Sequence, residues 1–213
     1  MKIDSGSTLL FIGDSITDCG RARPVGKSGF LGDGYVNLVE AWLGANRPEY
    51  QLRILNTGIS GNRIPDLQER WLRDALDLQP DWLSVMIGIN DVALQFSSVE
   101  GFDPVSLQTF VDIYRRLLGQ TLPVVKGIIL MTPYFLEIDK KDTIRRGMDR
   151  YGQAVKGLAE EYKTEFVDVQ AAFDAYLAHN PVLRISYDLV HPNTIGHMVI
   201  ARAFLQALGY LEE

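Results

Sequence analysis

Residues 8–15 read TLLFIGDS, an apolar run that stops at a glycine and an Asp-Ser pair. This pattern is typical of a short buried strand that ends in a polar turn. Four further runs have the same character: QLRILNT (51–57), WLSVMIG (82–88), VKGIILMT (125–132) and TEFVDV (164–169). Because these runs are apolar almost throughout, we expect strands that are covered on both faces, as in a parallel sheet.

Amphipathic patterns of helical period separate these runs. They lie at 35–46, 64–78, 105–120, about 142–162 and after Pro192. Strands that alternate with helices in this way predict an α/β fold built on a five-stranded parallel sheet. The length of 213 residues suits one domain, so we expect a single domain over 1–213.

Net charge and composition exclude some classes of binding partner. The formal net charge of −6 argues against nucleic acids and anionic membranes, which usually require a basic face. No apolar run reaches membrane-spanning length. Cys19 is the one cysteine, so no internal disulfide can form, which fits a reducing compartment. We therefore expect a cytoplasmic protein that acts on a small molecule, with no nucleic-acid or membrane partner.

Functional sites of open α/β sheets form just beyond the carboxyl ends of the strands. The first three predicted strands are each followed there by small polar residues or glycine: Ser15, Gly58 and Asn90. An acid–histidine pair, Asp188 and His191, lies just before the last predicted helix. These five residues are the candidates for a common site.

Their residue types suit hydrolysis by a serine nucleophile. A serine hydroxyl needs a neighbouring imidazole to take its proton, and a carboxylate holds that imidazole in the right tautomer. Ser15 is the candidate nucleophile, His191 the base and Asp188 its partner. The N–H groups of Ser15 and Gly58 and the amide of Asn90 could stabilise the developing oxyanion. The alternative is that Ser15 is only a helix N-cap, a common role for serine.

Taken together, these residues resemble the SGNH (GDSL-type) esterase and lipase hydrolases. The resemblance rests on GDSI (13–16), NTGISGN (56–62), GIND (88–91) and DLVHP (188–192), which occur in the family's order. It implies Ser15, Asp188 and His191 as the catalytic triad, with Ser15, Gly58 and Asn90 as the oxyanion hole. It also implies a flavodoxin-like, three-layer α/β/α sandwich, and the sequence indicates no cofactor and no metal.

Three further stretches resemble the intracellular bacterial acetyl-xylan and xylo-oligosaccharide esterases. They are FIGDSITDCGRARP (11–24), KGIILMTP (126–133) and HPNTIGHMVIARAF (191–204). This resemblance implies an acetylated sugar as substrate. Tyr134 and Tyr187 are then candidates for sugar stacking, and Arg63 is either a substrate contact or a solvated surface residue.

Other readings stay open at this point. The same chemistry could act on a lysophospholipid, a thioester or another short-chain ester, and an inactive carbohydrate-binding protein could keep the fold. Cys19 is a rival nucleophile without a supporting motif. Ser60 lies in a stretch (58–62) that only half-resembles the G-x-S-x-G nucleophile elbow, so a loop hydroxyl is the better interpretation. The spacing of His197 from His191 disfavours a zinc pair. The sequence leaves open whether the chain forms a homo-oligomer and whether the 92–105 loop covers the site.

Overall fold

The computed structural model describes residues 2–25, 30–96 and 104–212. In this part of the chain five strands form one parallel sheet in the order β2-β1-β3-β4-β5. The strands are β1 (Thr8–Gly13), β2 (Arg53–Asn56), β3 (Trp82–Met86), β4 (Gly127–Met131) and β5 (Glu165–Val167). This is the flavodoxin-like strand order, so the predicted fold class is confirmed.

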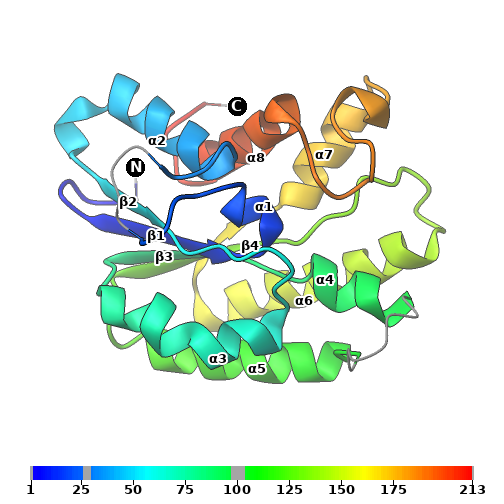
Figure 1. Cartoon of the computed structure of the whole chain (residues 1–213), viewed down its shortest axis with the longest axis horizontal. Coiled ribbons are helices and arrows are strands. Elements are labelled where there is room, and N and C mark those ends of the chain that lie inside the picture. Colours follow the sequence, from blue (N-terminus) through cyan, green and yellow to red (C-terminus); the bar gives the residue numbers. More distant parts are fainter. Residues whose placement is uncertain (1, 26–29, 97–103, 213) are drawn as a thin grey trace.

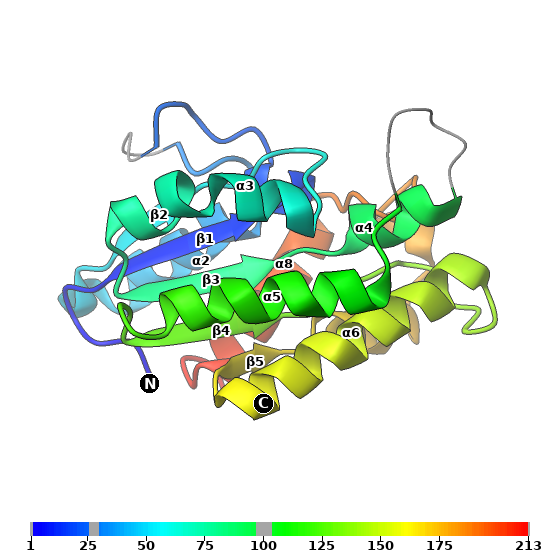
Figure 2. The same ribbon diagram turned by 90° about the horizontal axis from the view of Figure 1, so that it is seen from below.

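Helices cover both faces of the sheet and complete three layers (Figure 1). The shorter helices, of 11 residues or fewer, are α1 (Ser15–Asp18), α3 (Ile64–Asp74), α4 (Ile89–Ala93) and α7 (Val169–Leu177). The longer ones are α2 (Tyr35–Asn46), α5 (Leu107–Thr121), α6 (Thr143–Tyr162) and α8 (Thr194–Ala207). Single 3-10 turns lie at Pro48–Tyr50, Leu76–Leu78, Leu94–Phe96 and Val182–Arg184. Helices α2, α7 and α8 pack on one face, and α3, α5 and α6 cover the other (Figure 2).

Apolar periodicity explains why the helices bury the faces that they do. In α2 the residues against the sheet are Tyr35, Val36, Val39 and Leu43, which share one face of a helix. The strands between the two helical layers are almost fully buried, with Leu9, Leu10, Phe11 and Ile12 all at 0% exposure. None of the helices in the described part of the chain is both long and apolar enough to span a membrane.

Side-chain caps fix where the helices near the site begin. Asp14 accepts the N–H of Ile16 at 3.0 Å and so starts α1 at Ser15, directly after β1. Asn193 accepts the N–H groups of Ile195 and Gly196 and starts α8 at Thr194, three residues after His191. Ser15 is therefore the first residue of α1, and His191 lies just before the N-terminus of α8.

Candidate active site

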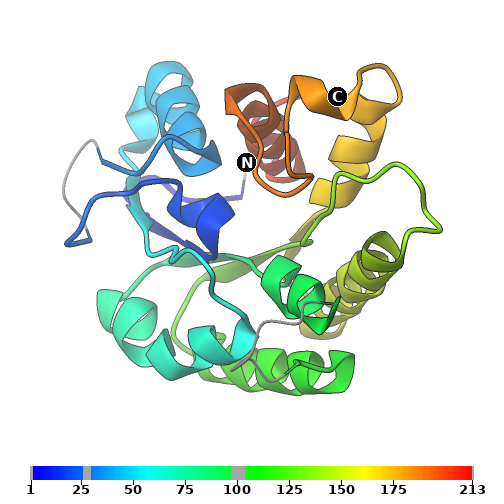
Figure 3. The same cartoon turned by 45° about the vertical axis from the view of Figure 1, so that its right-hand side comes forward.

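The nucleophile candidate lies at the carboxyl edge of the sheet. Ser15 follows β1, which lies between β2 and β3 in the sheet. Helix α4 follows β3 at the same carboxyl edge. Figure 1 shows α1 and α4 at this end with the connection between α7 and α8 above them, and Figure 3 turns this edge toward the viewer. Segments that are 176 residues apart thus meet here, since Ser15 Oγ lies 2.9 Å from His191 Nε2.

A continuous hydrogen-bond chain runs from Ser15 through His191 to Asp188. His191 Nδ1 lies 2.6 Å from Asp188 Oδ2, on the opposite side of the ring from Ser15. A carboxylate can only accept, so Nδ1 carries the ring proton and Nε2 is left to accept from the serine hydroxyl. This is the tautomer that a general base requires.

The loop around Asp188 keeps that carboxylate charged. Its Oδ1 accepts the N–H groups of His191 (2.8 Å) and Val190 (3.0 Å) and the hydroxyl of Ser186 (3.1 Å). Partial burial acts to raise the pKa of Asp188, but the hydrogen bonds from His191, Val190 and Ser186 outweigh it and hold the pKa well below its usual range. Asp188 is therefore an anion throughout the neutral range.

Asp14, the other carboxyl beside the nucleophile, has a different environment. It is 1% exposed, and burial raises its pKa to about 7 in spite of the Ile16 N–H bond. A carboxyl that resists ionisation is a poor partner for an imidazolium. The structure therefore gives Asp14 the capping role and leaves Asp188 beside the base.

Two of the predicted oxyanion donors are available. The N–H of Ser15 is the first of α1 and has no hydrogen-bond partner among residues 2–25, 30–96 and 104–212. Asn90, in the first turn of α4, donates one amide proton to Asn62 O at 2.9 Å. That bond fixes the amide and leaves its second proton for a ligand.

Gly58 is a correction to the sequence prediction. Its N–H donates to Asn56 Oδ1 at 2.9 Å, and the residue is buried, so the N–H does not face the site. A side chain here would collide with the backbone of α1 at Asp18, which explains the glycine by close packing. The residue that sequence reasoning missed is Gly61, the second glycine of the same NTGISGN motif.

Gly61 has the properties that Gly58 lacks. It is exposed, it has a φ of +83°, and its N–H has no partner in the part of the chain that the structure describes. Its neighbour Asn62 holds the Asn90 amide through its backbone carbonyl. Gly61 N–H therefore belongs to the same turn that orients Asn90, and the motif quoted from the sequence already contained it.

The three predicted substrate-binding residues have different positions. Tyr187 is 91% exposed beside Asp188 and can meet a ligand. Tyr134 is fully buried, its ring packs on Phe173 at 4.5 Å, and its hydroxyl donates to Val190 O at 3.0 Å. The prediction that Tyr134 stacks on a sugar is therefore wrong, because no face of its ring is accessible.

Arg63 is not a solvated surface arginine. Its side chain is 14% exposed and pairs with Asp66 at 3.4 Å, where it forms part of the N-terminal cap of α3. A contact with substrate stays a prediction. The 92–105 loop falls partly on residues 97–103, so the question of a cover over the site lies outside the described residues.

The rival nucleophile Cys19 packs against a buried histidine. Cys19 Sγ lies 3.4 Å from His197 Nε2, and His197 Nδ1 accepts the N–H of Tyr35 at 3.2 Å. Burial raises the pKa of the Cys19 thiol, helped by Asp33, so it stays protonated and unreactive. Across the described residues, no three His, Cys, Asp or Glu side chains are grouped to hold a metal ion.

His197 gives a testable pH dependence of stability. Burial lowers its pKa in the fold to about 4 from 6.5. As the pH falls, the unfolded chain therefore binds the proton first, and the contribution of neutral His197 to the free energy of unfolding, full above pH 6.5, is lost toward pH 4. We expect wild type to lose about 2 kcal/mol more than His197→Asn between pH 7 and pH 5, by urea denaturation. Equal pH dependence in both proteins would contradict this.

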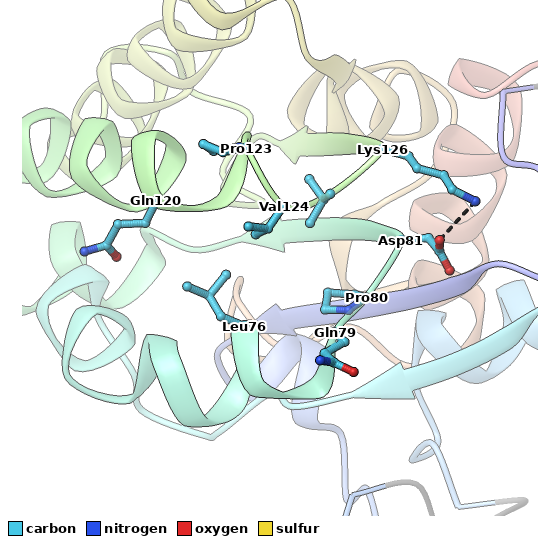
Figure 4. Close-up of a pocket in the computed structure, with 9 residues that line it drawn as sticks. Leu76, Gln79, Pro80, Asp81, Gln120, Pro123, Val124 and Lys126 are labelled. Atoms are coloured by element: carbon cyan, nitrogen blue, oxygen red, sulfur yellow. Dashed lines mark ion pairs between the residues drawn. The ribbon is translucent and has the colours of Figure 1, made fainter.

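A separate pocket of about 640 Å³ lies at the opposite edge of the sheet. Its wall includes Asp81 and Lys126, which form an ion pair at 3.0 Å just before β3 and β4 begin (Figure 4). The strands are parallel, so this pocket faces away from Ser15. It holds no serine, cysteine or histidine and does not supply the chemistry described above.

Comparison with known proteins agrees with this geometry. Residues 11–199 match the GDSL-like lipase/acylhydrolase family. The chain is 50% identical over 213 residues to an acetylxylan esterase of Geobacillus stearothermophilus, covering 99% of this chain and 97% of that protein.

Solved structures give the same picture. The crystal structure of Axe2, an acetylxylan esterase from that organism, is 50% identical with a TM-score of 0.96 and covers 99% of this chain and 98% of its own. Catalytic mutants of Axe2 that replace a serine, an aspartate or a histidine with alanine share this likeness. LAE5, an alpha/beta hydrolase enzyme from the metagenome of Lake Arreo, is 44% identical with a TM-score of 0.96 over 100% of both chains. The chain belongs to the GDSL-like lipase/acylhydrolase family and is a carboxylic ester hydrolase.

Proposed function

We propose that this protein removes acetyl groups from acetylated xylo-oligosaccharides through an acyl-enzyme intermediate. The observation that carries the proposal is the hydrogen-bond chain from Ser15 through His191 to Asp188 at the carboxyl edge of the sheet. The acetylxylan esterase with 50% identity over the whole chain supports the choice of ester. We further propose that 1–213 acts as one domain in the cytoplasm; self-association stays a prediction.

The first half of the reaction forms the acyl-enzyme. Ser15 Oγ attacks the acetyl carbonyl while His191 Nε2 takes the hydroxyl proton. The imidazolium is stabilised by Asp188, and it then gives the proton to the departing sugar oxygen. In the second half, water attacks the acetyl-serine with His191 again as base, which releases acetate and restores the serine.

The developing negative charge needs donors that are fixed before the reaction. We assign this role to the N–H groups of Ser15 and Gly61 and to the free amide proton of Asn90. Support comes from the N–H groups of Ser15 and Gly61, which have no hydrogen-bond partner among the described residues, and from the bond between Asn90 and the carbonyl of Asn62. The exposed ring of Tyr187 beside Asp188 is the candidate for contact with the sugar.

We expect Asn90→Ala to lower kcat by about 100- to 1000-fold, because an amide donor to the oxyanion acts mainly in the transition state. KM should change little. The measurement is steady-state kinetics on an acetylated xylo-oligosaccharide, with Asn46→Ala as a control on the exposed end of α2. Unchanged turnover in Asn90→Ala would remove Asn90 from the oxyanion hole.

The substrate class is tested by comparing acetate release from acetylated xylo-oligosaccharides with fatty-acid release from a lysophospholipid, using Ser15→Ala as the blank. Acetate release that is absent in the blank supports both the mechanism and the substrate. Fatty-acid release alone would keep the triad and overturn the carbohydrate assignment. No release from either substrate or from a simple aryl acetate would favour a binding protein on the same fold.

A further inference from the structure

A buried arginine contacts two of the three segments that carry an oxyanion donor and is linked to the third through Asn62. Arg70 projects from α3 and is 7% exposed. Its Nη2 donates to Gly13 O at 3.1 Å, its Nη1 to Thr57 O at 2.7 Å, and its Nε to the side-chain oxygen of Asn62 at 2.7 Å. Its Nη1 also pairs with Asp74 one turn along the helix, at 3.0 Å.

Gly13, Thr57 and Asn62 each lie in a segment that carries a proposed donor. Gly13 precedes the Asp14-Ser15 turn, and its carbonyl also accepts the N–H of Ile59, which joins that turn to the next loop. Thr57 begins the loop that leads to Gly61, and Asn62 ends it. The backbone carbonyl of Asn62 in turn holds Asn90. One guanidinium therefore links all three segments across which the donors are distributed.

Only arginine can make this set of contacts. Its planar group presents five N–H donors in fixed directions, whereas a lysine offers one flexible ammonium nitrogen. Burying the charge costs free energy that the single ion pair with Asp74 offsets only in part. An apolar residue here would also leave the carbonyl of Thr57 and the side-chain oxygen of Asn62 without these donors, so the position requires the fork.

We propose that Arg70 is a positioning residue that sets the spacing of the oxyanion donors. This rests on the proposed function above. Arg70 does not touch the substrate: it aligns the Ser15 turn, the Gly61 turn and the Asn90 amide on one oxygen atom. Its loss therefore weakens transition-state binding and leaves ground-state binding of the sugar nearly unchanged.

Arg70→Lys tests the proposal because it keeps the charge and removes the fork. Donor displacements of about 1 Å cost on the order of 100-fold, so we expect kcat to fall about 100-fold with little change in KM. Arg73→Lys is the matched control: the same substitution on the same helix, at a side chain that is 74% exposed and also pairs with Asp74. It should leave both constants unchanged. All assays are run on protein shown to be folded by thermal unfolding.

A double-mutant cycle with Asn90→Ala separates positioning from general support of the fold. If Arg70 acts through the oxyanion hole, the kcat of the double variant should be only slightly lower than that of the less active single variant. The reason is that both substitutions impair the same oxyanion hole. Fold-losses that multiply would overturn the inference, as would unchanged kcat in Arg70→Lys. Unchanged kcat in Asn90→Ala would instead count against the oxyanion assignment of the proposed function itself.

Asn62→Ala provides a second test of the proposal if Arg70→Lys does not fold. It removes only the Nε contact and retains the buried arginine with its other acceptors. We expect kcat to fall about 10-fold at constant KM, since the end of the loop that holds Gly61 and Asn90 loses its contact with Arg70 while Thr57 keeps its own. A kcat equal to that of wild type in folded Asn62→Ala would overturn the proposal.

Discussion

Replacing Ser15 with alanine is expected to lower kcat by about 10⁵- to 10⁶-fold and to leave the fold intact. The change removes the atom that forms the acyl-enzyme, so the remaining rate comes only from the oxyanion donors and substrate binding. The hydroxyl makes one side-chain hydrogen bond, to His191 Nε2, so little stability depends on it. Acetate release, together with thermal unfolding of both proteins, measures the two quantities.

Ser60→Ala is the matched control for this result. Ser60 lies in the loop that also provides Gly61, and its hydroxyl donates to Asp18 at 3.3 Å rather than to a histidine. Its replacement should cost far less activity than that of Ser15. Substantial activity in folded Ser15→Ala, or an equal loss in Ser60→Ala, would contradict the assignment of the nucleophile.

Asp188→Asn is expected to lower kcat by about 10⁴-fold. The asparagine oxygen can still accept the N–H groups of Val190 and His191, which keeps the loop in place. Its NH₂ group, however, donates to His191 Nδ1 and moves the ring proton to Nε2. The imidazole then points a proton at Ser15 and cannot act as a base.

The comparison that decides between the two nearby carboxyls is Asp14→Asn. An asparagine at this position can still cap Ile16 through its oxygen, and burial already favours the neutral form of Asp14. We therefore expect a much smaller loss of kcat than in Asp188→Asn. The reverse order of the two losses would show that the wrong carboxylate had been assigned to His191.

Most of the sheet could be predicted from the sequence because its strands are buried on both faces. Residues 8–13 form a strand with the expected bounds, and the other four strands fall inside the predicted runs. Helix α7 was missed because it starts two residues after the shortest strand, β5, and the polar Asp168 between them is its N-cap. Because a single residue joins this three-residue strand to the helix, the sequence shows one continuous pattern and no visible boundary between the two elements.

The site could be predicted where a side chain carries the chemistry. It could not be predicted where a backbone N–H group does. Ser15, His191 and Asp188 meet as expected because their side chains define the reaction. Gly58 and Gly61 look alike in sequence, and only the Asn56 side chain decides which N–H is free. Tyr134 was misplaced because sequence position after a strand does not show whether a ring turns inward.

The closeness of Ser15 to His191 has a consequence for how activity is acquired during synthesis. The nucleophile and the turns with the oxyanion donors are complete once β3 and α4 have left the ribosome. The base arrives about 100 residues later, on the connection between α7 and α8 that brings His191 to Ser15. The chain therefore stays inert until the segment that carries His191 lies beside Ser15, and the onset of hydrolysis during refolding reports that step directly.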